Sequence, residues 1–172
     1  MRTSKTEERD EGAERAPKLV RTAMVIAPDI ILDLINRRGA QRTREAALLF
    51  EAIAADIEAG KREQRPAYMA SITVPMMYYL ASSGPAGPAY ASGVIADLLR
   101  LLEVVPLSNQ DYHDALFFGK FESKFEYEDA IQFVTCRRVN AKYLVTRNNF
   151  GHVKRAPVDR RTAAEMLPFF RK

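Results

Sequence analysis

The sequence contains a single cysteine, Cys136, and no apolar run of the length of about 18 residues that a membrane-spanning helix needs. One cysteine cannot form an internal disulfide, and it leaves a cysteine-based zinc site without enough ligands. We therefore expect a reducing, cytoplasmic setting and no membrane contact. The opening stretch MRTSKTEERDEGAER has no apolar core, so neither a secretory signal nor an anchor is expected there.

Several catalytic motifs are also missing. The sequence has no GxSxG elbow, no Walker motif and no Cys–His pair. Its only glycine-rich stretch, SSGPAGPAYASG at 82–93, lies between two expected helices and lacks the spacing of a phosphate cradle. These absences argue against an α/β-hydrolase, a P-loop enzyme, and a flavodoxin-like or receiver-like domain.

The length and composition indicate one globular domain. The chain has 172 residues, of which 47% are apolar and 28% charged, enough to build one substantial core. Residues 1–17 contain five acids and four bases but almost no large apolar side chain. Such a segment cannot offset the entropy cost of ordering itself. We therefore predict a flexible charged tail over 1–17 and a single domain over 18–172.

Positive charge is concentrated toward the C-terminus. The whole chain carries +4, whereas residues 139–172 carry eight bases against two acids, which gives +6 for that segment and −2 for residues 1–138. This end is compatible with contact to RNA phosphates, with an acidic protein partner, or with a solvated surface. The candidates for RNA contact are Arg147, Lys154 and Arg155.

Short apolar segments alternate with helical patterns along the chain. Strands are expected at 18–27, 68–71, 104–107, 143–146 and 156–158. Helices are expected at about 28–39, 44–59, 73–83, 89–102, 108–118 and 126–138, with a last one opened by the capping box at Thr162 and Glu165. This alternation predicts an α/β layered fold with a mainly parallel sheet.

Five segments together resemble the PIN domain, the fold of VapC-type toxin ribonucleases. They are VIAPDIILDLI at 25–35, ALLFEAI at 47–53, ASITVPMMYYL at 70–80, and EDAIQF at 128–133 followed by YLVTRN at 143–148. The resemblance spans most of residues 20–170. It implies a three-layer fold in which helices flank a central, mainly parallel sheet of about five strands.

The resemblance also implies a chemistry, namely RNA hydrolysis by three or four carboxylates around one or two Mg²⁺ or Mn²⁺ ions. Hard divalent cations need anionic oxygen ligands, and the bound metal activates a water molecule and stabilises charge on the phosphate. This sequence departs from the pattern, because the positions of the first, second and fourth acids carry Ala27, Met76 and Gly151. Asp129 occupies the third acid position, with Glu128 beside it, and Asp29 stands where the family usually has Asn.

The candidate catalytic residues are accordingly Asp29, Glu128 and Asp129, with Asp29 and Asp129 as the candidate metal ligands. Each also has a purely structural interpretation, because acids are favoured in the first turn of a helix without any catalysis. His152, next to the fourth acid position, is typical of a surface loop, and Met76 is typical of core packing.

Three functional hypotheses follow. The first is a PIN-fold protein with an eroded metal centre and weak or absent RNA cleavage, which pairs as a homodimer or with an antitoxin-like protein. The second is an active endoribonuclease in which Asp29 and Asp129 hold one Mg²⁺ or Mn²⁺, assisted by Glu128 or Asn149. The third is a module that binds RNA or a protein without chemistry and needs no cofactor. The count of acids favours the first and third hypotheses.

Overall fold

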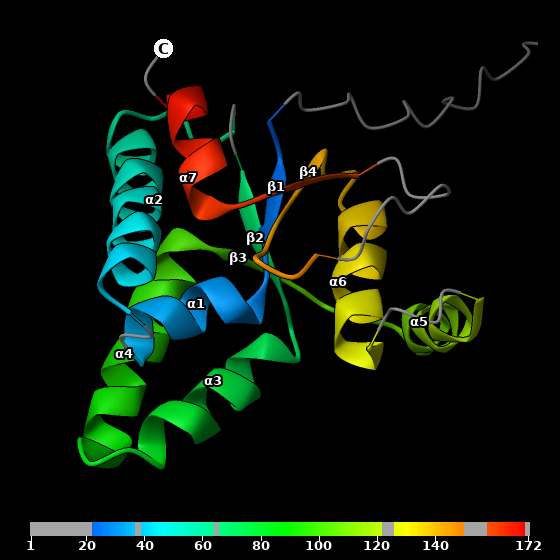
Figure 1. The fold of residues 1–172 in the computed structure, drawn as a ribbon, viewed down its shortest axis with the longest axis horizontal. Helices are drawn as coiled ribbons and strands as arrows, with labels where there is room; N and C mark the ends of the chain where they lie inside the picture. The colour runs from blue at the N-terminus through cyan, green and yellow to red at the C-terminus, as the bar shows by residue number, and fades with distance from the viewer. Residues whose placement is uncertain (1–21, 37–38, 64–65, 122–125, 150–157, 171–172) are drawn as a thin grey trace, which may run out of the picture.

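The computed structural model describes residues 22–36, 39–63, 66–121, 126–149 and 158–170, and these residues build a central five-stranded sheet (Figure 1). The strand order is β3-β2-β1-β4-β5, and every neighbouring pair is parallel. The strands are β1 Met24–Ile26, β2 Ala67–Ala70, β3 Glu103–Val105, β4 Tyr143–Val145 and β5 Asp159–Arg161. The predicted α/β fold with a parallel sheet is confirmed.

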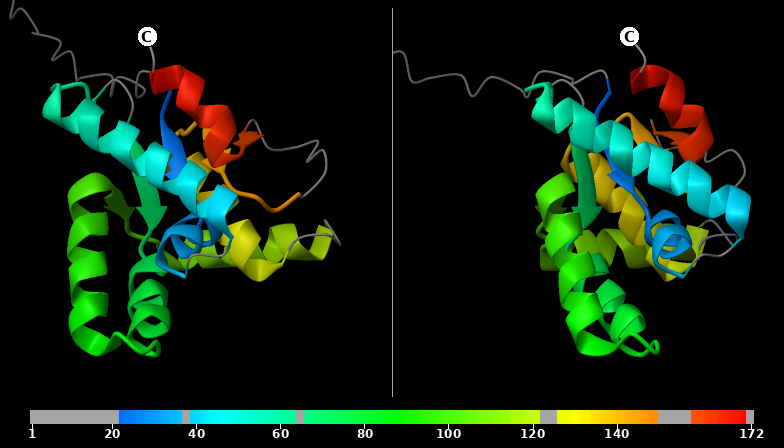
Figure 2. Two further views of the ribbon diagram at one scale, coloured as in Figure 1. Left: turned by 60° about the vertical axis from the view of Figure 1, so that its left-hand side comes forward. Right: turned by 90° about the vertical axis from the view of Figure 1, so that its left-hand side faces the viewer.

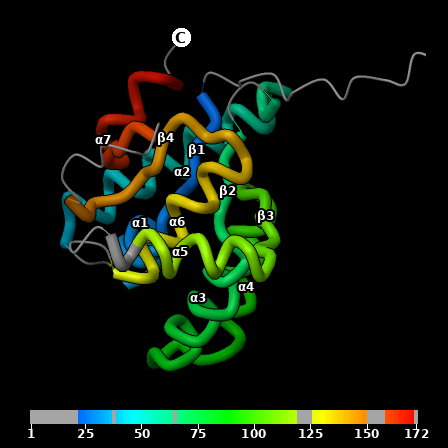
Figure 3. The backbone as a smooth tube through the Cα atoms, turned by 90° about the vertical axis from the view of Figure 1, so that its right-hand side faces the viewer, coloured from blue at the N-terminus to red at the C-terminus, as the bar shows by residue number. Residues whose placement is uncertain are grey.

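Helices cover both faces of the sheet, which makes three layers. One face is covered by α1 Pro28–Ile35, α2 Ala40–Glu58, α3 Thr73–Ser82, α4 Gly87–Leu101, α7 Ala163–Met166 and the 3₁₀ turn η1 Leu167–Phe170. The other face is covered by α5 Asn109–Phe121 and α6 Tyr127–Arg138. These two helices lie side by side (Figure 3), joined by ion pairs from Arg138 to Asp111 and from Arg137 to Asp114.

The central strand β1 is buried on both sides, as the apolar run MVI predicts for a parallel sheet. Met24 and Ile26 pack into the larger core under α1, α2 and α4, whereas Val25 points to the opposite face and packs with α6. The adjacent β4 follows the same alternation, with Leu144 on the α6 side. The side chains that follow β1 and β4 are therefore attached to strands that are packed on both faces.

Helices α3 and α4 form a hairpin that extends beyond the end of the sheet (Figure 2). No charged residue occurs between Ser71 and Ala96, which spans α3, the connecting turn and most of α4. Several large side chains on this hairpin are nevertheless exposed, namely Ile72, Tyr78, Tyr79 and Tyr90. None of the helices within the described residues is long and apolar enough to cross a membrane.

Most predicted elements are present with shifted ends, and one predicted strand lies mostly outside the described residues. The final strand was expected at 156–158, but β5 runs from Asp159 to Arg161, while 156–157 lie outside the described residues. Its pairing is set by backbone hydrogen bonds from Asp159 N to Lys142 O and from Thr146 N to Arg161 O. Such a polar edge strand carries no apolar signal. The capping box at Thr162 and Glu165 is confirmed.

One further boundary moved because of a glycine. The second helix begins at Ala40 rather than at Arg44, directly after Gly39, whose φ of 103° is accessible to glycine at little cost. Residues 1–17, the predicted tail, lie outside the described residues.

Candidate functional site

The candidate site lies at the edge of the sheet where β1 and β4 end, which we call the carboxyl edge. The two strands are parallel neighbours, with Ile26 paired to Val145. Helix α1 begins two residues after β1 and carries Asp29 in its first turn. Thr146, Arg147 and Asn148 follow β4 directly. In a parallel sheet, such adjacent strand ends form the crevice where functional groups gather.

Asp29 ties helix α1 to the segment after β4. Its Oδ2 atom accepts hydrogen bonds from the Arg147 backbone N at 2.7 Å and from the Thr146 hydroxyl at 3.2 Å. The Thr146 side chain is buried, and its Oγ1 atom also accepts a bond from Asn148 N at 3.1 Å. The Oδ1 atom of Asp29 is buried and has no hydrogen-bond partner within the described residues. This carboxylate is therefore held in place by its second oxygen alone.

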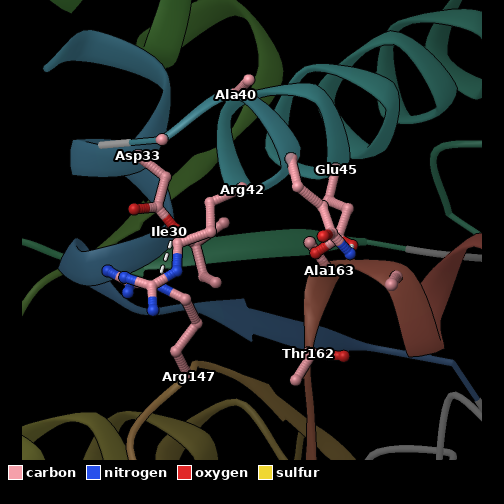
Figure 4. Close-up of a pocket in the computed structure, with 11 residues that line it drawn as sticks. Ile30, Asp33, Ala40, Arg42, Glu45, Arg147, Thr162 and Ala163 are labelled. Carbon is pink, nitrogen blue, oxygen red and sulfur yellow. Dashed lines mark hydrogen bonds and ion pairs between the residues drawn. The ribbon is translucent and has the colours of Figure 1, made fainter. Parts of the chain in front are cut away.

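The guanidinium group of Arg147 lies against two aspartates of α1, Asp29 and Asp33. Its Nε atom is 2.6 Å from Asp33 Oδ2 and 3.8 Å from Asp29 Oδ2, and its Nη2 donates to the Asp29 backbone O at 3.4 Å. Asp33 is only 2% exposed. Figure 4 shows the Asp33 and Arg147 side chains directed toward one another. A buried carboxylate needs such a partner, because an unpaired buried charge is strongly destabilising.

Asp129, at the start of α6, reaches the same edge. Its Oδ1 atom accepts a hydrogen bond from Asn148 Nδ2 at 3.0 Å. Burial raises the pKa of Asp129, the Asn148 bond opposes that rise, and the negative charges of Glu126, Asp29 and Glu128 add to it. Asp29 and Asp129 are thus near enough to repel one another, although Asp129 lies in the first turn of a helix that follows another helix rather than a strand.

The other predicted residues are less informative. Glu128 is exposed on the first turn of α6. Lys154 and Arg155, with Gly151 and His152, lie outside the described residues. The RNA-binding role predicted for Arg147 stays a prediction, as do the catalytic and metal-binding roles of Asp29, Glu128 and Asp129.

Two positions where a metal-binding carboxylate is expected carry apolar side chains. Ala27 is 4% exposed and sits at the N-cap of α1. Met76, on α3, packs against the main core, as predicted. Neither residue can supply an oxygen ligand through its side chain.

The remaining side chains do not fit the divalent metal centre that the sequence resemblance implies. No group of three or more His, Cys, Asp and Glu within the described residues is arranged to hold a metal ion. Arg147 already balances negative charge on Asp29 and Asp33, and Asp129 shares one oxygen with Asn148. A hard cation at this edge would have to compete with a guanidinium group for its anionic ligands.

A chain of the VapBC2 structure from Rickettsia felis, solved bound to a DNA fragment from the promoter, has a similar backbone. The TM-score is 0.56 at 16% sequence identity, and the match covers 82% of this chain and 98% of that one. The fold is PIN-like. No protein-family model matches the sequence. No curated protein matches it either.

The PIN-like frame also holds a pocket of about 600 Å³ beside Arg147. It lies between α1, the start of α2 and the start of α7, and Asp33, Arg42, Glu45, Arg147 and Thr162 contribute to its wall (Figure 4). The sequence did not single out Asp33 or Thr146 as site residues. For Asp33, the sequence signal was its spacing from Asp29, because residues four positions apart lie on one face of a helix.

Proposed function

We propose that this chain is a PIN-like domain related to VapC-type ribonucleases that has lost metal-dependent RNA cleavage and acts by binding. The observation that carries the proposal is the composition of the carboxyl edge. Ala27 and Met76 replace two expected acids, and each remaining carboxylate at the strand ends is engaged by a neighbouring side chain or backbone group. One or two such carboxylates bind Mg²⁺ poorly without further ligands.

A cleavage assay tests the loss of catalysis. Wild type and Asp129→Asn should leave a labelled, unstructured RNA equally intact in millimolar Mg²⁺ or Mn²⁺. A metal that binds only the folded state would stabilise it by about 2.7 kcal/mol at a hundredfold excess over the dissociation constant, and we expect far less for wild type. Cleavage, or a saturable rise in melting temperature, that requires Mn²⁺ and disappears in Asp129→Asn would establish the active nuclease instead.

The binding partner that we favour is a protein, and the α3–α4 hairpin is the surface. Three tyrosines project from its uncharged stretch, residues 71–96, with Tyr79 69%, Tyr90 44% and Tyr78 41% exposed. Tyrosine is enriched at the cores of protein interfaces, where charged residues are depleted. The similar structure from Rickettsia felis is a VapBC complex, which supports an antitoxin-like partner for this chain, or a second copy of it.

Analytical ultracentrifugation tests the second-copy form of this pairing. Wild type should sediment as a concentration-dependent dimer, and Tyr79→Glu should be a monomer because it buries a charge at the contact. Glu103→Gln, on the β3 strand outside the hairpin, is the matched control and should leave the dimer intact. A wild type that stays monomeric at about 100 μM, far above the concentration needed for a micromolar pair, would exclude the homodimer.

RNA binding is a second candidate, favoured by one contact. Arg160, on the edge strand β5, donates from Nη1 to the Asn148 backbone O at 3.4 Å, so a guanidinium group borders the carboxyl edge. If RNA phosphates bind there, the logarithmic slope of affinity against salt should fall by roughly 0.7 for each phosphate contact removed. Fluorescence anisotropy with Arg160→Glu and with the Lys154→Glu, Arg155→Glu double variant measures that slope. No binding at about 50 mM salt would rule this candidate out.

A further inference from the structure

We propose that the guanidinium group of Arg147 is the resident cation of the carboxyl edge. It takes the charge-balancing place of a divalent metal, and shortening it exposes a Mn²⁺ or Mg²⁺ site formed by Asp29 and Asp33. This inference rests on the proposed function, because it presumes that the wild-type protein holds no such ion. It identifies Arg147 as the residue that keeps a metal from binding, and it predicts which substitution makes the chain bind one.

The spacing of the two aspartates creates the need for a cation. Asp29 and Asp33 are four residues apart within α1, so their side chains lie on the same helix face. Two like charges in this arrangement destabilise a helix unless something positive lies between them. The Nε atom of Arg147 lies within 3.8 Å of one carboxylate oxygen from each aspartate.

Burial of the two aspartates increases their need for a nearby positive charge. The side chain of Asp33 is 2% exposed and that of Asp29 16%, so water cannot fully solvate either charge. The α2 residue Thr43 contacts Asp33 only through the backbone, its hydroxyl donating to Asp33 O at 3.0 Å. The Arg147 guanidinium group, with its Nε atom 2.6 Å from Asp33 Oδ2, supplies positive charge at this carboxylate.

The hydrogen bonds of residue 147 also favour arginine over lysine at this position. The Arg147 backbone N donates to Asp29 Oδ2, and its side-chain Nη2 donates to the Asp29 backbone O. Both the backbone and the side chain of Arg147 are therefore bonded to the first turn of α1. A lysine could supply the charge but not a planar fork of donors. The contact between α1 and the end of β4 thus depends on the shape as well as on the charge of Arg147.

The ligands left behind by a shorter side chain suit a small, hard cation. Asp29 and Asp33 would supply carboxylate oxygens, and Asp29 Oδ1 already lacks a hydrogen-bond partner within the described residues. Two carboxylates completed by water make only a weak site for Mg²⁺ or Mn²⁺, but freeing them from the guanidinium group should make binding measurably tighter than in wild type. The pocket of about 600 Å³ has both Asp33 and Arg147 in its wall, so it provides a route for the ion (Figure 4).

Mn²⁺ titration followed by electron paramagnetic resonance tests the proposal. The samples are wild type, Arg147→Ala, Arg147→Lys and Arg42→Ala. Arg42 is the matched control, since it lines the same pocket but makes no ion pair within the described residues. We expect Arg147→Ala to bind Mn²⁺ at least about tenfold more tightly than the other three proteins, a change that Asp33→Asn in the same chain should abolish.

A second measurement keeps the proposal testable if Arg147→Ala folds poorly. The double variant Arg147→Ala, Asp33→Asn removes both charges, and it should be more stable to urea than Arg147→Ala alone. Equal or lower stability of the double variant would contradict the charge-balancing role.

The outcomes separate this inference from the proposed function. Tight Mn²⁺ binding by wild type would overturn both. Arg147→Ala binding Mn²⁺ no better than Arg42→Ala would overturn only the inference, and wild type could still be a non-cleaving protein. A gain in Arg147→Ala that Asp33→Asn leaves unchanged would place the ion elsewhere and would also refute the inference.

Discussion

Replacing Thr146 by valine isolates the hydroxyl group that joins α1 to the end of β4. Valine has nearly the same shape but cannot donate to Asp29 Oδ2 or accept from Asn148 N, the two bonds measured at 3.2 and 3.1 Å. Thr146 is 1% exposed, so water cannot easily replace the lost partner. The lost hydrogen bond to the charged Asp29 carboxylate contributes about 1.5–3 kcal/mol, whereas Asn148 is exposed and its N–H can bond to water instead.

We therefore expect Thr146→Val to lower the free energy of unfolding by about 2 kcal/mol, because Asp29 keeps its bond from Arg147 N. For a chain of this size, that corresponds to a fall of roughly 4–8 °C in melting temperature. Urea unfolding followed by circular dichroism measures it.

Thr146→Ser is the matched control, since it keeps the hydroxyl and loses only a methyl group, worth about 1 kcal/mol. If Thr146→Val were as stable as wild type, or more stable than Thr146→Ser, the side chain would act through packing alone. The hydrogen-bond account of the carboxyl edge would then be wrong.

Two other predictions concern titratable groups. Because burial raises the pKa of Asp129, its ionisation opposes folding. The stability linked to this carboxyl group is fully present below its pKa in the unfolded chain and is lost as the pH rises through its pKa in the folded protein. The free energy of unfolding of Asp129→Asn, measured with urea, should therefore increase relative to that of wild type between pH 4 and pH 7. A pH-independent difference would contradict this. Burial also raises the pKa of the Cys136 thiol, which is fully buried on α6. Ellman's reagent should therefore react with it only as fast as the protein unfolds, and rapid native labelling would refute its burial.

The sheet could be predicted from the sequence where its strands are apolar on both faces. Segments such as Met24–Ile26 and Tyr143–Val145 are continuous apolar runs, and these became the adjacent central strands β1 and β4. The edge strand Asp159–Arg161 has no such run, because one side of an edge strand needs no partner. Apolar patterning therefore identified the centre of the sheet and its β3 edge, but not the polar β5 edge.

In the candidate site, local sequence patterns predicted the position of a residue in a helix but not its contacts with residues distant in the sequence. The position of Asp29 in the first turn of a helix follows from Pro28 and the apolar residues after it. Its pairing with Arg147 joins residues 118 positions apart, and no local pattern reports such a contact. The prediction that Arg147 contacts RNA came from the charge of its segment and stays a prediction, and the contacts of its guanidinium group with Asp29 and Asp33 of α1 were not foreseen.

The polar contacts of the carboxyl edge form one connected chain across three elements. Asp29 on α1 accepts from Thr146 after β4, Thr146 accepts from Asn148, and Asn148 donates to Asp129 on α6. Because each member orients the next, deleting one side chain also weakens bonds that it does not make itself. The effects of Thr146→Val and Asp129→Asn should consequently not add, and their interaction in a double-mutant cycle measures how far α1 and α6 are held together through this edge. Strict additivity would mean that the two carboxylates are anchored independently.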